Sequence, residues 1–236
     1  MKKTIFTTTT NPTCLLFLFI FCLLFESCSN DQPKETIHKE ATHIDERAIQ
    51  FNDRGLVFSN EFFTFGGDSI LLDSALYYFK EALRIDENCL AARHNIKPVL
   101  FALEQYDELL SLLQSDLNRF DEHDYFSKAI TQEAIAAGYH AKGDSISEAF
   151  YLSMVQANYK LALEHNLNSF TVMGYLDYLT RTEGKEIALK ELEKYKSVLK
   201  NANSQDSHTV DSYDAMKDYI ENYDEADKDN TIQLHL

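Results

Sequence analysis

The sequence predicts an all-α protein built from repeated helix pairs, and three observations favour this class. The chain of 236 residues contains only 7 Gly and 3 Pro, too few for the many tight turns of a β-sandwich or a β-barrel. Leu, Ala, Glu and Lys, which favour helices, are frequent. Apolar residues recur at helical spacing, and the pattern itself repeats along the chain.

The repeats have periods close to 34 residues. The apolar positions of residues 73–88 recur 34 positions later in residues 107–117, and a second pair of segments recurs 33 positions apart. The equivalent positions are Ala75 and Leu109, Leu76 and Leu110, Phe79 and Leu113, Leu83 and Leu117, then Val155 and Ala188, Tyr159 and Leu192, Ala162 and Tyr195. One helix pair cannot bury its apolar face alone, so the repeats predict about four pairs stacked into an α-solenoid.

Each repeated helix has a candidate partner helix ahead of it. The partners are marked by Gly55 and Phe58, by residues 93–104, by Ala136 and Tyr139 before Gly143, and by Met173, Leu176 and Leu179. Pro98 lies inside the second of these and costs about 3 kcal/mol unless it opens or kinks the helix. We therefore assign residues 45–206 to the repeat domain, 207–223 to a capping helix and 224–236 to an acidic tail.

The best repeat resembles the tetratricopeptide repeat family. Residues 75–88 (ALYYFKEALRIDEN) resemble its second helix almost position for position, and Asn52, Gly55 and Phe58 resemble the Asn, Gly and Tyr of its first helix. The chain departs from the family in lacking Trp, in Glu87 where a Pro usually stands, and in extra residues after Gly55 and after Gly143. The resemblance implies degenerate repeats whose first helices line a peptide-binding groove.

The first 27 residues predict a signal peptide. Lys2 and Lys3 precede the apolar run Leu15–Phe25, which as a helix is about 16 Å long and roughly half of a bilayer core. Ser27-Cys28-Ser29 resembles the lipobox of bacterial lipoproteins, in the looser form common in Bacteroidota, which implies diacylglycerol attachment to Cys28 and a polar tether over 28–44. The alternative is cleavage after Ser29, which releases a soluble periplasmic protein.

Composition and motifs argue against catalysis and against nucleic-acid binding. The net charge of -16 lacks the basic face that phosphate binding needs. The sequence has no GxSxG, HExxH, P-loop or CxxC motif. His38 and His43 are interpreted as part of a solvated tether, and Cys89 as a small buried hydrophobe. We therefore expect no enzyme activity, no cofactor and no metal.

The candidate binding residues lie on the predicted first helices. By the family resemblance, the groove presents Asn52, His94, Asn95, Phe101 and His140, accompanied by Phe51, Leu56, Ser59, Glu133, Met173 and Asp177. An amide offers a donor and an acceptor to a peptide unit, although hydrogen bonds from Asn52 and Asn95 to neighbouring backbone are the preferred expectation. A clamp for a terminal carboxylate is not expected, because Arg181 is the only cation near these positions.

The segment 59–70 (SNEFFTFGGDSI) is a second candidate. It is read as an insertion whose Phe62, Phe63 and Phe65 either form an exposed aromatic contact or fold back over the first helix pair. Folding back is the preferred expectation, because three Phe in so short a segment are usually buried.

These observations favour a non-catalytic scaffold that is lipid-anchored at the bacterial outer membrane or in the periplasm and binds a protein or peptide partner. One alternative is a glycan- or ligand-binding envelope lipoprotein that uses the aromatic segment. Another is an immunity or inhibitor protein whose acidic surface neutralises a basic toxin.

Overall fold

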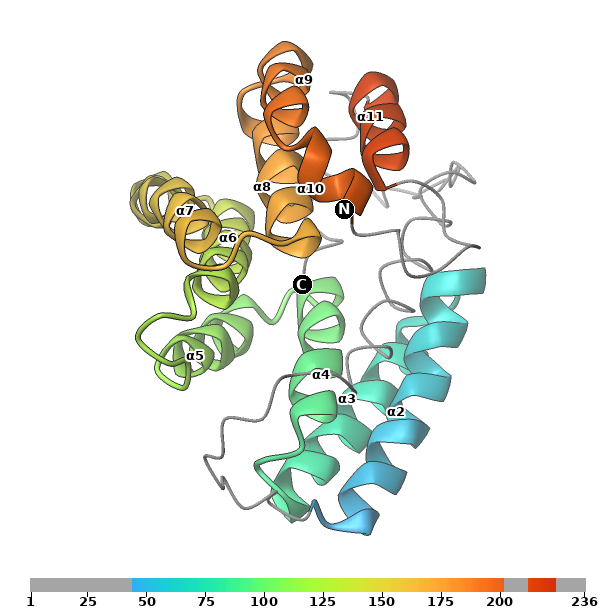
Figure 1. Ribbon diagram of the computed structural model, residues 1–236. Helices are drawn as coiled ribbons and strands as arrows, with labels where there is room; N and C mark the ends of the chain where they lie inside the picture. Colours follow the sequence, from blue (N-terminus) through green and yellow to red (C-terminus); the bar gives the residue numbers. More distant parts are fainter. Residues whose placement is uncertain (1–43, 202–211, 224–236) are drawn as a thin grey trace. The chain divides into compact units, whose positions relative to one another are not determined.

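The computed structural model describes residues 44–201 and 212–223, and within them every regular element is an α-helix (Figure 1). The expected all-α class is therefore confirmed. The ten helices of these ranges are α2 (Glu46–Phe65), α3 (Ser69–Ile85), α4 (Leu90–Ala102), α5 (Tyr106–Leu117), α6 (Tyr125–Ala141), α7 (Ser145–His165), α8 (Ser169–Thr182), α9 (Lys185–Lys194), α10 (Lys196–Asn201) and α11 (Ser212–Asn222).

The helices pack mainly against their neighbours in the chain. Each helix from α2 to α9 contacts the next one, and α2 also contacts α4. The last helix, α11, packs on α8, α9 and α10 and lies within the range expected for a capping helix. The expected signal peptide, Cys28, the tether up to residue 43 and the acidic tail lie outside the described residues.

Two apolar cores hold these helices together, and α6 contributes to both. The first core gathers side chains of α2 to α6 around Phe79 and Leu100, and it includes Ile135 of α6. The second gathers side chains from α6 to α11 around Tyr159 and includes Ala129 of α6. Full burial of one such large side chain contributes about 1.5–3 kcal/mol. Because α6 places buried residues in both cores, it connects the two cores to each other.

A glycine allows α2 and α3 to approach closely. A Cβ atom placed on Gly55 would lie 2.5 Å from Cε1 of Phe79, and Phe79 is completely buried. The Gly at this position of the repeat pattern therefore has a steric reason, because any larger residue would collide with an aromatic ring that is held in the core.

The segment 59–70, expected as an insertion, belongs mostly to helices and does not form a long loop. Helix α2 continues to Phe65 and α3 begins at Ser69, so three residues connect the two helices. Gly66 turns the chain with a φ of 71°, and the Asp68 carboxylate caps α3 by accepting a bond from the Ile70 amide at 3.2 Å. The extra residues lengthen both helices, and a long α7 takes up those after Gly143 in the same way.

The three Phe of this segment differ in how far they are buried. Phe62 packs against the first core, as the preferred expectation requires. Phe63 and Phe65 are 49% and 84% exposed, so for these two residues that expectation is wrong.

Pro98 lies inside α4 as expected, and the His94 carbonyl consequently lacks the amide donor of an unbroken helix.

Candidate functional site

The two asparagines of the predicted groove meet directly. Asn52 in α2 is 4% exposed, and Nδ2 of Asn95 in α4 donates a hydrogen bond to its Oδ1 at 2.9 Å. Nδ2 of Asn52 donates to Oδ1 of Asp53 at 3.4 Å. The pair joins α2 to α4, so much of its hydrogen-bonding capacity serves the contact between these two helices.

His94 lies directly before Asn95 in α4 and is exposed at the surface. Desolvation by the crowded surroundings of the ring, followed by the positive charge of Lys97, lowers the pKa of His94 below its usual value, while Asp116 opposes the shift. The imidazole is therefore neutral near pH 7 and offers one donor and one acceptor.

The other two predicted groove residues do not join the asparagine pair. Phe101 is half-buried near the end of α4, and its ring packs edge-on against Tyr106 with centroids 5.5 Å apart. His140 lies at the end of α6, where its Nδ1 is 3.0 Å from Oε1 of Glu148 in α7. Phe101 shares a helix with His94, whereas His140 is directed toward α7.

Several of the other residues predicted to line the groove lie in the protein interior. Ser59 is buried and donates to the Leu56 carbonyl at 3.2 Å, while Phe51, Leu56 and Met173 pack against the two cores. Glu133 is 8% exposed. Ser59 and Glu133, like Asn52, therefore expose little surface to a partner.

A buried ion cluster joins α4 to α5. Asp116 is 6% exposed and receives two cations, with Nζ of Lys97 2.8 Å from its Oδ2 and Nε of Arg93 bonded to its Oδ1. Arg93 and Lys97 are themselves largely buried. Because two cations share one carboxylate, this cluster carries an excess positive charge in a strongly acidic chain.

A second buried cluster joins α6, α7, α8 and α11. Nη2 of Arg181 lies 2.7 Å from Oε1 of Glu133 and 2.7 Å from Oδ2 of Asp177. Tyr159 donates to Oε2 of Glu133 at 2.9 Å, and Tyr219 of α11 donates to Asp177. The two carboxylates outweigh the cost of burial and raise the pKa of Arg181, whereas burial raises that of Tyr159. Arg181 therefore serves the interior rather than a groove.

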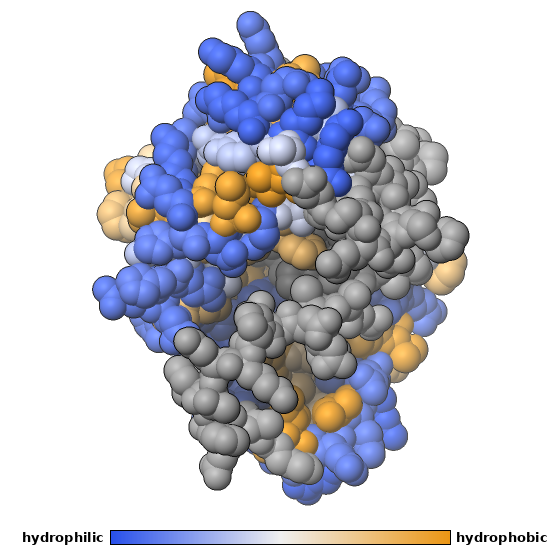
Figure 2. Space-filling model, in the orientation of Figure 1, coloured by the Kyte–Doolittle hydropathy of each residue, from blue (hydrophilic) through white to orange (hydrophobic). Residues whose placement is uncertain are grey.

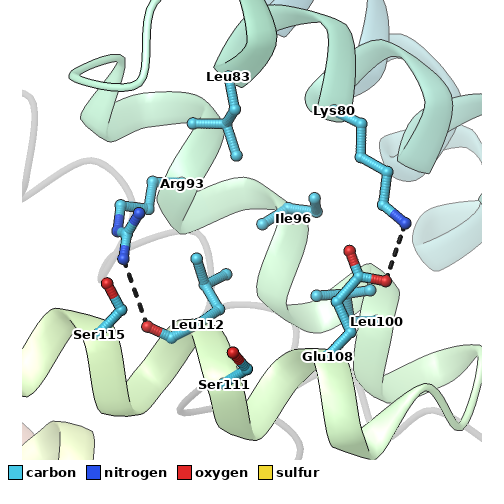
Figure 3. A pocket seen from close by; sticks show the side chains of 9 residues that line it. All are labelled: Lys80, Leu83, Arg93, Ile96, Leu100, Glu108, Ser111, Leu112 and Ser115. Atoms are coloured by element: carbon cyan, nitrogen blue, oxygen red, sulfur yellow. Dashed lines mark hydrogen bonds and ion pairs between the residues drawn. The ribbon is translucent and has the colours of Figure 1, made fainter.

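An open hollow of about 340 Å³ lies between α3, α4 and α5 (Figure 3). Its polar rim includes the Lys80–Glu108 ion pair, with Nζ 2.8 Å from Oε2, and the Arg93 guanidinium, which donates to the Leu112 carbonyl at 3.4 Å. The lining residues are Lys80, Leu83, Arg93, Ile96, Leu100, Glu108, Ser111, Leu112 and Ser115. Its apolar floor and paired rim charges suit an apolar side chain better than a reacting group.

The residues that the structure describes contain no group of three or more His, Cys, Asp or Glu side chains placed to hold a metal ion. Among the helices of the same ranges, none has the length and apolar character needed to cross a membrane. Cys89 is a free and buried thiol, as the sequence predicts.

Comparison with known proteins adds no family to this description. No protein-family model, curated protein or solved structure matches the chain.

Proposed function

We propose that the chain is a non-catalytic interaction module of the bacterial cell envelope, in which degenerate tetratricopeptide-like helix pairs bind a protein or peptide partner. The observation that carries this proposal is the sequential packing of α2 to α9, in which the first helices of two successive pairs, α2 and α4, also touch. Repeated helix pairs packed in this way offer one continuous surface to an extended partner.

The proposed contact surface is the outward side of α4 next to the Asn52–Asn95 bond. His94 and Phe101 are seven residues apart and so lie on the same side of this helix. The neutral imidazole supplies a donor and an acceptor, and Phe101 supplies a partly exposed apolar ring. Beside His94, the hydrogen bond between Asn95 and Asn52 joins α4 to α2.

A matched pair of histidine variants tests this surface. His94→Ala is expected to reduce recovery of the partner after gentle crosslinking and purification from membrane extracts, because it removes polar contacts from the surface. His123→Ala is the control, since His123 is also exposed but precedes α6. Recovery of the chain alone from wild-type extracts, or equal recovery of the partner with both variants, contradicts the proposal.

We further propose that Cys28 carries the lipid that tethers this module to the outer membrane, with a soluble periplasmic protein as the alternative. Metabolic labelling with a lipid analogue is expected to mark the wild-type chain and to leave Cys28→Ser unmarked. Label that survives the substitution contradicts lipidation at Cys28 and leaves the helix-pair surface unaffected.

A second candidate function is glycan binding, and the exposure of Phe63 and Phe65 favours it. Aromatic faces held at the end of a rigid helix are suitable contacts for sugar rings. Phe65→Ala is expected to abolish binding on a glycan array, whereas Tyr77→Ala, which removes an exposed ring from α3, is expected to retain it. Absence of binding by the wild type rejects this candidate.

A further inference from the structure

The hollow between α3, α4 and α5 has an aliphatic floor (Figure 3). Four side chains from the three helices form it, namely Leu83, Ile96, Leu100 and Leu112. Among the described residues that line the hollow, none is aromatic, so it lacks the flat faces on which sugar rings and nucleobases stack. Figure 2 shows mainly hydrophilic residues on the coloured surface of the molecule. An aliphatic floor is therefore an exception on this surface, and it suits a flexible aliphatic chain.

Two serines of α5 supply polar groups to the same hollow. Ser111 and Ser115 lie one turn apart, and both line it. Ser74 of α3 donates its hydroxyl hydrogen to the Ile70 carbonyl at 2.8 Å. Within the described ranges, by contrast, the hydroxyl groups of Ser111 and Ser115 make no hydrogen bond, and Figure 3 draws none. Both hydroxyl groups can therefore donate to a ligand.

Arg93 adds a cationic donor to this hollow. Its Nε bonds to Asp116, and its Nη2 donates to the Leu112 carbonyl at 3.4 Å. Its Nη1 has no hydrogen-bond partner among the described residues, although the side chain is only 13% exposed. Figure 3 shows the guanidinium and the Ser115 hydroxyl on the same side of the hollow. A guanidinium nitrogen and a hydroxyl placed in this way suit the two oxygens of a carboxylate.

The charges around the hollow leave one cation in excess. Lys80 and Glu108 pair with each other, whereas Arg93 and Lys97 share the single carboxylate of Asp116. This excess positive charge lies in a chain whose net charge is -16. It favours a ligand with one negative charge and disfavours a cation, which would add a second unpaired positive charge.

We infer that this hollow binds an aliphatic monocarboxylate of the medium-chain fatty acid class, with its chain on the aliphatic floor and its carboxylate against Arg93 and Ser115. The hollow of about 340 Å³ has the volume of about eleven waters at about 30 Å³ each, so it accommodates roughly eight to ten carbon atoms. A largely apolar lining with a few convergent polar groups is typical of small-molecule sites. The site is independent of the proposed partner surface, because neither His94 nor Phe101 lines it.

Isothermal titration calorimetry of the purified full chain with octanoate tests the inference. The wild type is expected to bind one octanoate per chain. Octylamine has a similar aliphatic chain but a positive charge, and it is expected to bind at least about tenfold more weakly because its ammonium group would face Arg93. Absence of octanoate binding, or equal binding of octylamine, overturns the inference.

Filling the hollow tests its location. Ser111→Leu is expected to occupy the hollow with an apolar side chain and to weaken octanoate binding by at least about tenfold. Ser153→Leu makes the same change at an exposed position of α7 and is expected to bind octanoate as the wild type does. Circular dichroism checks that both variants are folded. Equal affinity of the two folded variants overturns the inference.

A conservative variant tests the carboxylate contact. Arg93→Lys keeps a cation beside Asp116 but removes the guanidinium donor, so it is expected to weaken octanoate binding several-fold. Arg84→Lys is the matched control, because Arg84 pairs with Glu81 outside the hollow, and it is expected to bind octanoate as the wild type does. Equal octanoate affinity of these two variants overturns the inference.

Discussion

Buried ions distinguish this chain most clearly at the scale of single residues. The Arg181 side chain is 8% exposed and pairs with two carboxylates, while the Arg84 side chain is 70% exposed and pairs with Glu81, one turn away in the same helix. Removing one partner from a buried pair leaves an uncompensated charge, whereas an exposed pair contributes little. The two arginines therefore have very different consequences for stability.

Arg181→Met is expected to lower the free energy of unfolding by about 3–5 kcal/mol, because Glu133 and Asp177 are left buried without their cation. Urea unfolding followed by circular dichroism measures the change. Arg84→Met is the matched control and is expected to leave stability unchanged. A loss from Arg181→Met no larger than that of the control contradicts the structural role of the cluster.

The spacing of residues predicts which positions share one side of a helix, but it does not predict which distant side chains meet. The family resemblance placed Asn52 and Asn95 in the predicted groove, and the structure joins them by a hydrogen bond. It also identified Arg181 as the one cation near the predicted groove, but could not show that it is buried. The partner Glu133 lies 48 positions away on another helix, and no local pattern encodes such a contact. The Asp116 cluster was missed for the same reason.

At the scale of helices, the sequence predicted helix pairs but not the lengths of their members. Extra residues relative to a repeat pattern indicate either a loop or longer helices, and spacing alone does not distinguish them. Residues 59–65 continue α2, so their Phe residues follow the helical path. Phe62 faces the core while Phe63 and Phe65 face outward.

The packing of α2 on α3 depends on Gly55. Gly55→Ala is expected to destabilise the protein by about 1–3 kcal/mol, because the new methyl group would collide with the buried ring of Phe79. Thermal and urea unfolding measure the effect.

A compensating change tests the same contact. Because Phe79→Leu removes the ring atoms nearest to Gly55, Gly55→Ala is expected to cost less in a Phe79→Leu background than in the wild type. Equal costs in the two backgrounds would mean that steric contact with Phe79 does not determine the choice of glycine.

At the scale of the whole molecule, buried tyrosines make the described helices sensitive to high pH. Burial raises the pKa of Tyr175 to about 12, and burial together with Asp177 raises the pKa of Tyr219. Unfolded tyrosines ionise near pH 10, so only the unfolded chain loses these protons at first. Their contribution to stability is therefore complete below about pH 10 and is lost as the pH rises toward 12.

Alkaline titration is accordingly expected to unfold the helices together with ionisation of the buried tyrosines. Tyrosinate absorbance and far-ultraviolet circular dichroism, followed in one sample, measure the two events. Tyr175→Phe is expected to shift the midpoint of unfolding to higher pH, since it removes one group that ionises in the unfolded chain. Complete ionisation of the tyrosines with the helices intact would contradict these raised pKa values.

The composition and the spacing of apolar residues predicted the all-α class, because few Gly and Pro together with a helical apolar pattern are typical of helical proteins. The tetratricopeptide-like solenoid, the lipid at Cys28 and the partner surface remain predictions. A partner surface depends on which side chains stay exposed after packing, and this is decided by contacts such as the Glu133–Arg181 pair rather than by local sequence.

The central claim is that the outward side of α4 binds a partner in the cell envelope, and site-specific photocrosslinking tests it most directly. A photoreactive residue at position 94 is predicted to yield one discrete adduct with a different protein in intact cells, and a residue at position 123 is predicted to yield none. No adduct at position 94, or the same adducts from both positions, would contradict the claim.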